Sequence, residues 1–354
     1  MGTRVTIMAG GTGGHVYPAL AVAEDLRGRG CEVTWIGTAV GLEARLVPEA
    51  GIPFDRLRVS GVRGKSLVRR VLAPLMLAGA CAEAAAILRR RRPHVVLGLG
   101  GFASGPGGVM ARILGIPVVI HEQNRVPGTT NRWLARIARR VLEAFPQSFS
   151  PSVGAICTGN PLRAALAQAE PGARREPSPP LRLLVFGGSL GAKVLNEILP
   201  AALAGDASWD VRHQTGAAMR DETVERYRKA GVSARVDAYI DDMVEAYAWA
   251  DLVVCRAGAM TVSELAAVGL PAILVPFPHA IDDHQTANAR YFSDAGAGVC
   301  LPQSELTPER LATELRALRE DPARLKAMAG SARALARLDA APRVADIVLQ
   351  EASA

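Results

Sequence analysis

Short β-branched segments alternate with helical stretches along almost the whole chain, and this alternation constrains the fold more than any other feature. The clearest β-branched segments lie at residues 4–9, 33–36, 118–121, 181–186 and 252–255. Strands that alternate with helices build parallel sheets with helices packed on both faces. We therefore predict an α/β fold with doubly wound parallel sheets.

The length of the chain and one change in composition predict two domains. At 354 residues the chain is long for a single hydrophobic core. Residues 169–180 (AEPGARREPSPP) are rich in proline and charge and show no apolar periodicity, as expected for a linker. Two doubly wound halves would form a cleft at the carboxyl ends of their strands, where such sheets bind ligands.

Composition and charge narrow the class of protein. Hydrophobic residues make up 49% and charged residues 21%, a profile typical of globular rather than disordered chains. The five cysteines are scattered without a C-x-x-C motif, which favours a reducing compartment over a disulfide framework. The net charge of +7 indicates an anionic partner: a phosphorylated substrate, a lipid surface or nucleic acid.

We expect neither a targeting segment nor a membrane-spanning segment in this chain. Because a strand is predicted from residue 4 onward, we expect no signal peptide before the fold. The start Met1-Gly2 formally fits a myristoylation pattern, but Thr6 lies in the predicted strand, so we treat the match as chance. The longest uncharged runs, 71–82 and 265–281, are too short or too rich in glycine and proline to span a bilayer.

Glycine-rich turns follow several predicted strands, and the first of them is GGTGGH at 10–15. We compared the glycine positions in this part of the chain with two common nucleotide-binding motifs. A dinucleotide fingerprint needs a third glycine where Val16 stands and an acid where the second strand ends at 36–38 (IGT). A P-loop ending at 64–66 (GKS) needs an earlier glycine where Val59 stands. Both motifs are excluded.

The same turn places His15 at the start of a helix. A histidine there is able to act as a general base, because its unperturbed pKa of about 6.5 lies near working pH. It is equally a polar residue at a helix end with no chemistry. The loop alone leaves both interpretations open.

The stretch at 258–285 (GAMTVSELAAVGLPAILVPFPHAIDDHQ) is predicted to form one side of a pocket for a sugar nucleotide. Free amides at the helix start would bind phosphate, Glu264 would hold ribose hydroxyls, and Gln285 would reach a sugar ring. Alternatively, residues 261–264 (TVSE) form a capping box that needs no ligand. The turn at 187–192 offers amides and Ser189 to a phosphate, or is a plain βα turn.

Histidine spacing and basic residues suggest further properties. The six histidines lack metal-ligand spacing, so we predict no protein-bound metal. Arg163 beside the linker either reaches a diphosphate or faces solvent.

The basic and apolar segment 62–92 fits a helix at a lipid interface, or a core helix with solvated basic ends. Its scarcity of aromatic residues argues against stacking on single-stranded nucleic acid. The candidate membrane-docking residues are Lys65, Arg69, Arg70, Leu72, Leu75 and Met76.

Eight short motifs together resemble one enzyme family. They are GGTGGH at 10–15, GGFASGPGG at 100–108, HEQN at 121–124, TGNPLR at 158–163, GGSLGA at 187–192, IDDM at 240–243, RAGAMTVSEL at 256–265 and DHQTANA at 283–289. In this order they resemble the MurG family of bacterial peptidoglycan glycosyltransferases.

The resemblance implies a GT-B fold, in which two doubly wound Rossmann-like domains face each other across a cleft. Residues 1–162 would form the acceptor- and membrane-binding domain, 163–180 the linker and 181–338 the UDP-GlcNAc-binding domain. Residues 339–354 would form a helix that returns to the N-terminal domain.

The implied reaction is an inverting transfer of GlcNAc from UDP-GlcNAc to the C4 hydroxyl of undecaprenyl-pyrophosphoryl-MurNAc-pentapeptide (lipid I), which forms lipid II. It would take place at the cytoplasmic face of the cell membrane, on an anionic inner-membrane surface, with neither a cofactor nor a nucleic-acid partner. The resemblance makes His15 the base and membrane docking of segment 62–92 an expectation. The residues that it implies for UDP-GlcNAc binding are Thr12, Gly13, Gly14, Asn124, Arg163, Ser189, Ile240, Ala259, Met260, Thr261, Glu264 and Gln285.

Two departures from the family and three alternative functions stay open at this point. Phe102 stands where some relatives have tyrosine, and His284 where some have a second glutamine. The alternatives are a GT-B enzyme with another acceptor, a UDP-GlcNAc epimerase that needs no acceptor, and a protein that binds a nucleotide sugar without turnover. Acceptor-dependent release of UDP separates all three from the main prediction.

Overall fold

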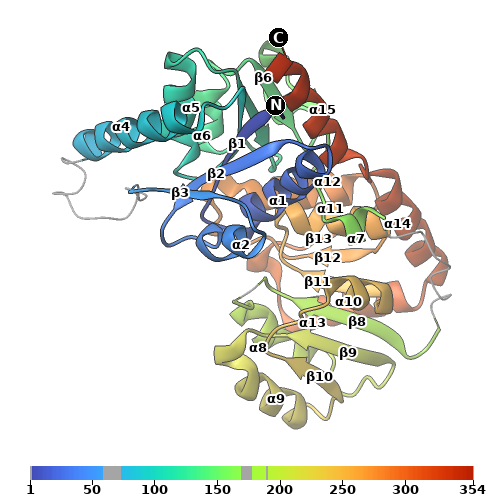
Figure 1. Cartoon of the computed structure of the whole chain (residues 1–354). Helices are drawn as coiled ribbons and strands as arrows, with labels where there is room; N and C mark the ends of the chain where they lie inside the picture. The colour runs from blue at the N-terminus through green and yellow to red at the C-terminus, as the bar shows by residue number, and fades with distance from the viewer. Residues whose placement is uncertain (1, 59–72, 169–177, 189, 354) are drawn as a thin grey trace. The chain divides into compact units, whose positions relative to one another are not determined.

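The computed structural model describes residues 2–58, 73–168, 178–188 and 190–353. These residues form two compact units (Figure 1). Unit 1 comprises residues 1–164 and 337–354, and unit 2 comprises residues 165–336. The last segment of the chain therefore belongs to the same unit as the first.

Unit 1 is built on a parallel sheet that has seven strands in the described part of the chain, in the order β3-β2-β1-β4-β5-β6-β7. Its strands are β1 (Arg4–Ala9), β2 (Glu32–Thr38), β3 (Phe54–Leu57), β4 (Val95–Gly100), β5 (Val118–Glu122), β6 (Arg140–Glu143) and β7 (Ile156–Cys157). Its helices are α1 (Gly13–Gly28), α2 (Glu43–Glu49), α4 (Ala73–Arg91), α5 (Ser104–Ile113), α6 (Thr129–Leu134) and α15 (Ala340–Ser353), with the short turn η1 (Pro151–Val153).

Alternation along the strands divides the core of unit 1 into two layers. Val5 and Ile7 of β1 pack against α1 and α15 on one face, whereas Met8 packs with α4 and α5 residues on the other. This is the period of two that sends successive strand side chains to opposite faces. Helix α15 contributes Val344 and Val348 to the first layer, so the chain end completes the core of unit 1.

Unit 2 carries a second parallel sheet, which has six strands among the described residues, in the order β10-β9-β8-β11-β12-β13. The strands are β8 (Leu181–Phe186), β9 (Trp209–Gln214), β10 (Ala234–Asp237), β11 (Leu252–Cys255), β12 (Ala272–Leu274) and β13 (Gly298–Cys300). The helices are α8 (Lys193–Ala202), α9 (Arg220–Lys229), α10 (Met243–Trp249), α11 (Ala259–Val268), α12 (His284–Asp294), α13 (Pro308–Arg319) and α14 (Pro322–Ala334), with short turns η2 (Ala217–Met219), η3 (Ile281–Asp283) and η4 (Gln303–Glu305). Helix α7 (Ala164–Ala167) lies at the boundary of the two units.

Strand order reverses direction at one place in each sheet, between β1 and β4 in unit 1 and between β8 and β11 in unit 2. Doubly wound sheets bind ligands at such switch points, outside the carboxyl ends of the strands. The loops that leave these four strands begin at residues 10, 101, 187 and 256. They carry four of the glycine-rich motifs found in the sequence.

The structure corrects several predicted elements. Helix α1 begins at Gly13, so His15 lies in its first turn, and α5 occupies a stretch that the sequence indicated only as a glycine-rich motif. Glycine is needed inside α5 because a Cβ on Gly107 would lie 2.3 Å from the Met8 sulfur. Within the basic and apolar segment 62–92, the structure has helix α4, Ala73–Arg91; residues 62–72 lie outside the described part.

Candidate functional site

The loop after β1 is held in place by Glu43, the first residue of α2. Glu43 is fully buried, and its carboxylate accepts hydrogen bonds from the Gly11 amide (2.9 Å), the Thr38 amide (2.9 Å) and the Thr38 hydroxyl (2.6 Å). A Cβ on Gly10 would lie 2.3 Å from the Glu43 Oε1 atom. The sequence analysis missed this carboxylate, although a glutamate that follows a buried strand by five residues is a usable signal.

The loop after β4 lies directly against the loop after β1. A Cβ on Gly101 would come within 2.3 Å of the Gly10 carbonyl oxygen, and Gly101 has φ +81°, a left-handed value that favours glycine. Gly100, with φ +104°, lies against the imidazole of His15, where a Cβ would be 2.9 Å from Cε1. Glycine at both positions therefore allows the two switch-point loops of unit 1 to meet around His15.

His15 lies in the first turn of α1, where its amide donates to the Thr12 carbonyl over 3.1 Å. Its Nδ1 atom lies 2.8 Å from Oε1 of Gln123, which follows β5. The backbone amides of Gly13 and Gly14 have no helical carbonyl in a preceding turn to which they could donate, as at any helix N-terminus. The first switch point thus combines amide donors with a half-buried imidazole, a set that suits a phosphorylated substrate and proton transfer.

Asn124 is held by Glu122, which lies two residues before it in the chain. The Glu122 carboxylate is 1% exposed and accepts from the Asn124 amide (2.9 Å) and side chain (3.2 Å), the Gly128 amide (3.1 Å) and the Asn131 side chain (2.9 Å). One buried carboxylate therefore organises the loop from 122 to 131 and fixes the orientation of the Asn124 backbone.

In unit 2, helix α11 begins two residues before the predicted capping box. Gly258 occupies the cap position, and Thr261 is the third residue of the helix, without a side-chain cap hydrogen bond. The capping-box interpretation of residues 261–264 is therefore wrong. Glu264 instead accepts a hydrogen bond from the hydroxyl of Tyr247 over 2.9 Å, a contact that the sequence analysis missed.

Other predicted donor-site residues of unit 2 lie on loops and helix starts around α11. Ile240 is 3% exposed and follows β10, while Ala259 is buried and Met260 and Thr261 are half-buried in the first turn of α11. Gln285 lies in α12, and its Oε1 atom accepts from the Phe277 amide over 2.9 Å. Ser189 lies outside the described residues.

The turn before α12 is strained. Asp282 and Asp283 have φ values of +54° and +50°, a left-handed conformation that is costly for residues with a Cβ. Such strain is found preferentially at ligand-binding turns. The second of these residues, Asp283, lies two residues before Gln285.

Comparison with known proteins decides the family. Residues 5–143 match the Glycosyltransferase family 28 N-terminal domain, and residues 182–344 match the corresponding C-terminal domain. Over 356 residues and 100% of both chains, the protein is 60% identical to the UDP-N-acetylglucosamine--N-acetylmuramyl-(pentapeptide) pyrophosphoryl-undecaprenol N-acetylglucosamine transferase of Methylococcus capsulatus. It is 55% identical to the enzyme of the same name from Alkalilimnicola ehrlichii, over 98% of this chain and 99% of that one. The chain belongs to the MurG family of glycosyltransferases.

Solved structures confirm the predicted GT-B class of two Rossmann-like domains for this MurG-family chain. The crystal structure of Acinetobacter baumannii MurG matches with a TM-score of 0.84 and 41% identity, over 98% of this chain and 99% of that one. A UDP-GlcNAc 2-epimerase from Neisseria meningitidis matches with a TM-score of 0.68 at 13% identity, over 98% of this chain and 100% of that one. The second likeness shows the fold alone.

Arg163 of this MurG-family chain lies on the α1 side of unit 1. Its guanidinium carbon is 5.6 Å from the centre of the Tyr17 ring, a cation–π contact. Both residues line a cavity of about 630 Å³ with Leu20, Glu24 and other residues of α1 and the α2 region. The Tyr17 ring also packs against Gly13 at the start of α1, since a Cβ on Gly13 would lie 3.0 Å from it.

Of the predicted membrane-docking residues, Leu75 and Met76 are described and lie exposed on α4, 71% and 38% respectively. Lys65, Arg69, Arg70 and Leu72 lie outside the described residues. The basic end of α4 is partly neutralised, because Arg90 and Arg91 form ion pairs with the buried Asp55.

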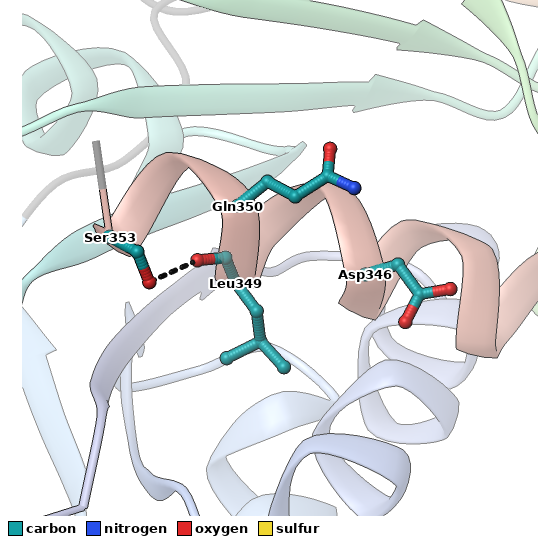
Figure 2. A pocket seen from close by; sticks show the side chains of 4 residues that line it. All are labelled: Asp346, Leu349, Gln350 and Ser353. Carbon is teal, nitrogen blue, oxygen red and sulfur yellow. Dashed lines mark hydrogen bonds between the residues drawn. The ribbon is translucent and has the colours of Figure 1, made fainter.

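Two other observations describe the MurG-family chain away from the switch points. An open hollow of about 600 Å³ lies on α15. Figure 2 shows the side chains that line it, Asp346, Leu349, Gln350 and Ser353, none of which is a predicted site residue. Among the described residues, no helix is long and apolar enough to cross a membrane, and no group of histidine, cysteine and acidic side chains has the geometry of a metal site.

Proposed function

We propose that this chain transfers N-acetylglucosamine from UDP-GlcNAc to the C4 hydroxyl of undecaprenyl-pyrophosphoryl-MurNAc-pentapeptide, lipid I, and so forms lipid II in peptidoglycan synthesis. The observation that carries the proposal is the 60% identity, over the whole chain, to a protein that bears the name of this transferase. The glycine-rich loops at both switch points support it, because they offer backbone amides to the two pyrophosphate groups of the substrates.

The proposed reaction is a single displacement with inversion. His15 takes the proton of the acceptor C4 hydroxyl, and the hydroxyl oxygen forms a bond to the anomeric carbon of GlcNAc. The bond between that carbon and the phosphate oxygen of UDP breaks, and its electron pair leaves with UDP. Helix-start amides stabilise the charge that develops on the leaving diphosphate, which is commonly a large contribution to such catalysis.

Donor recognition is assigned by extending the family resemblance to matching residues. Glu264 holds the ribose hydroxyls, and Ile240 lies against uracil. Gln285, Asn124 and the backbone near Ala259 contact the GlcNAc group. The diphosphate contacts are assigned to Thr12, Gly13, Gly14, Arg163, Ser189, Met260 and Thr261. The hydrogen bond from Tyr247 supports the role of Glu264, because it orients that carboxylate before ligand arrives.

The test is release of UDP from UDP-GlcNAc, measured with and without a lipid I analogue. We expect acceptor-dependent release together with a new disaccharide-lipid product. His15→Ala should lower turnover by about 100- to 10,000-fold, the usual contribution of a general base, and leave UDP affinity unchanged. His94→Ala, which removes an exposed histidine of the same unit, is the control. Near-normal turnover of His15→Ala would remove His15 from the base role.

The same assay separates the proposal from the three alternatives. An epimerase would convert UDP-GlcNAc without an acceptor, and a binding protein would hold the donor without releasing UDP. A transferase for another acceptor would release UDP only with that acceptor. The epimerase likeness carries no weight of its own because it extends to the fold alone.

We further propose that unit 1 docks peripherally on an anionic membrane at the cytoplasmic face, through a surface formed by α4, α5 and α6. These helices lie side by side in the sequence order α4, α5, α6 (Figure 1). Their exposed apolar side chains are Leu75, Met76 and Leu77 of α4, Val109 and Ile113 of α5, and Trp133 of α6. We call this set the apolar docking face.

Basic residues accompany the apolar docking face. Arg112 and Arg132 are exposed, and the guanidinium carbon of Arg136 lies 4.5 Å from the centre of the Trp133 ring. A tryptophan beside arginine suits the boundary between lipid headgroups and acyl chains. Arg139 and Arg140, which are half exposed, are instead paired with Glu351 of α15.

Vesicle sedimentation tests the docking proposal. Ile113→Asp should lower the fraction bound to phosphatidylglycerol vesicles by about tenfold or more, because burying an isoleucine side chain contributes about 2 kcal/mol. Turnover with a water-soluble acceptor should stay unchanged. Val224→Asp is the matched control, since Val224 is also exposed on a helix but belongs to unit 2. Equal binding by both variants would reject this face.

A further inference from the structure

A chain of hydrogen bonds connects His15 with the backbone of the segment TGN at 158–160. His15 Nδ1 lies 2.8 Å from Gln123 Oε1. Gln123 Nε2 lies 3.0 Å from His121 Nδ1 and 3.0 Å from the His121 carbonyl oxygen. His121 Nε2 lies 2.9 Å from the Gly159 carbonyl oxygen. The HEQN and TGNPLR motifs therefore meet behind the histidine of the GGTGGH motif.

The direction of every bond in this chain follows from its far end. The Gly159 carbonyl has no proton to donate, so His121 must carry its proton on Nε2. His121 is fully buried, and burial lowers its pKa to about 4, which keeps the ring neutral at physiological pH. A neutral ring that is protonated on Nε2 presents a lone pair on Nδ1.

The orientation of the Gln123 amide is then fixed twice. Both the His121 lone pair and the His121 carbonyl oxygen require a donor, and only the amide NH₂ group supplies two. The amide oxygen must therefore face His15. Gln123 is itself 1% exposed, and the side chain of Asn160 donates to its backbone carbonyl over 3.1 Å, so both the backbone and the side chain of Gln123 are held by hydrogen bonds.

We propose that Gln123, oriented by His121, is a positioning residue that holds neutral His15 in the tautomer protonated on Nδ1, with the lone pair on Nε2. An amide oxygen accepts hydrogen bonds and has no proton to donate, so it pairs only with an Nδ1–H group. The second ring nitrogen is left as the one able to accept a proton. Which nitrogen of a histidine is protonated is set by the hydrogen bond made by the other.

The proposal rests on the proposed function at one point, the role of His15 as base. If His15 takes the proton of the acceptor hydroxyl, it does so through Nε2, and Nδ1–H stays bound to Gln123 during the step. Gln123 does not take the proton, because an amide oxygen is too weak a base. The backbone of Gly100 packs against the same ring, so orientation and tautomer are fixed together.

A purely structural role for Gln123 would predict something different. It would place the amide there to satisfy buried polar groups, with no preference for either tautomer of His15. The positioning role and the structural role predict different protonation of the His15 ring, which is observable without turnover. The two roles also predict different effects of a carboxylate at position 123 on the dependence of rate on pH.

The first measurement is nitrogen NMR of the full-length protein labelled with ¹⁵N only in its six histidines. Spectra recorded at alkaline pH should show Nδ1 protonated and Nε2 bare in His15, and the opposite pattern in His121. A His15→Gln variant assigns the His15 signals by their loss. A His15 ring protonated on Nε2 in the wild-type protein would overturn the proposal.

The second measurement compares the pH–rate profiles of two variants. Gln123→Met has similar length and no acceptor, so it should lower kcat by about 10- to 100-fold, as is typical when a partner that orients a functional histidine is lost. Its KM for UDP-GlcNAc should stay unchanged. Gln123→Glu keeps an acceptor for Nδ1–H, and its negative charge favours the protonated ring, so the acidic limb of the profile should move to higher pH. Gln350→Met, an exposed glutamine on α15, is the control (Figure 2).

The outcomes keep this proposal apart from the proposed function. If His15→Ala retains turnover, the base role fails, and the wild-type spectrum still decides the tautomer. If His15→Ala is inactive while Gln123→Met and Gln350→Met have equal kcat, the base role stands and positioning by Gln123 is overturned. An acidic limb that stays in place in Gln123→Glu would also count against the proposed contact.

Discussion

Replacing Glu43 by glutamine should release the loop that precedes His15. The Glu43 carboxylate is fully buried and is the acceptor for Gly11 on one oxygen and for both donors of Thr38 on the other. In Glu43→Gln the amide oxygen is expected to stay with Thr38, where it satisfies two donors. The NH₂ group then faces the Gly11 amide, and two donors meet with no acceptor between them.

The size of the effect of Glu43→Gln follows from the loss of the hydrogen bond between the Gly11 amide and the carboxylate. A hydrogen bond to a charged group contributes about 1.5–3 kcal/mol, and a buried donor left without a partner is costly in addition. We expect the free energy of opening the hydrogen bond between the Gly11 amide and residue 43 to fall by about 2–3 kcal/mol. This fall corresponds to amide exchange about 30- to 150-fold faster at Gly11. Because the same loop leads into the first turn of α1, kcat should fall by about tenfold.

Hydrogen exchange of the peptide that contains Gly11, followed by mass spectrometry, measures how often the hydrogen bond of the Gly11 amide opens. Glu49→Gln is the matched control, because Glu49 lies on the same helix with its side chain 56% exposed. Exchange at Gly11 that is equal in Glu43→Gln and Glu49→Gln would refute the reasoning. Faster exchange with unchanged kcat would restrict Glu43 to a structural role.

Three further predictions concern single side chains. Gly100→Ala should lower kcat by about tenfold or more without changing UDP affinity measured by calorimetry, because the added Cβ would lie 2.9 Å from the His15 ring and Gly100 has φ +104°. Tyr247→Phe removes the hydrogen bond to Glu264 and should raise the Kd for UDP about fivefold, equivalent to about 1 kcal/mol, with kcat unchanged in the same assays. Burial lowers the pKa of His213 to about 3, so below pH 6.5 an unfolded chain binds a proton that the folded one excludes. The free energy of unfolding should therefore fall by about 2 kcal/mol between pH 7.5 and pH 5, and urea denaturation of His213→Gln should lack that part of the decrease.

The fold was predictable from the sequence because its main strands are buried, β-branched and followed by helices. Residues 4–9, 181–186 and 252–255 are observed with the predicted bounds, as β1, β8 and β11. Strands β6, β7 and β13 were missed. They have four, two and three residues, too few to show a period, and they lie toward one edge of their sheets, where polar residues such as Arg140 are tolerated.

The candidate site was predictable only where its signals are local. Glycine-rich turns after strands place the loops at the switch points correctly, because a turn and the strand before it are neighbours in sequence. The contacts that orient the side chains join distant positions: His15 and Gln123 are 108 residues apart, and Gly11 and Glu43 are 32 apart. The capping-box interpretation failed for a related reason, since the partner of Glu264 is Tyr247 on another helix.

The helices at the switch points leave the positive ends of their dipoles without an acidic side chain in the first turn. Helices α1, α5, α8 and α11 follow the four switch-point strands, and none has an acidic residue in its first turn as described. By contrast, α9, α10 and α13 carry Asp221 and Glu222, Glu245, and Glu309 there. Acidic residues in the first turn stabilise a helix, because they offset the positive end of its dipole. Leaving them out at these four helices forgoes that stabilisation and keeps the positive field available to an anionic ligand. The omission is not confined to these four helices, since α6, α12 and α14 also have no acidic residue in the first turn. At the switch points it leaves the positive helix ends free to act on the diphosphates of the proposed substrates.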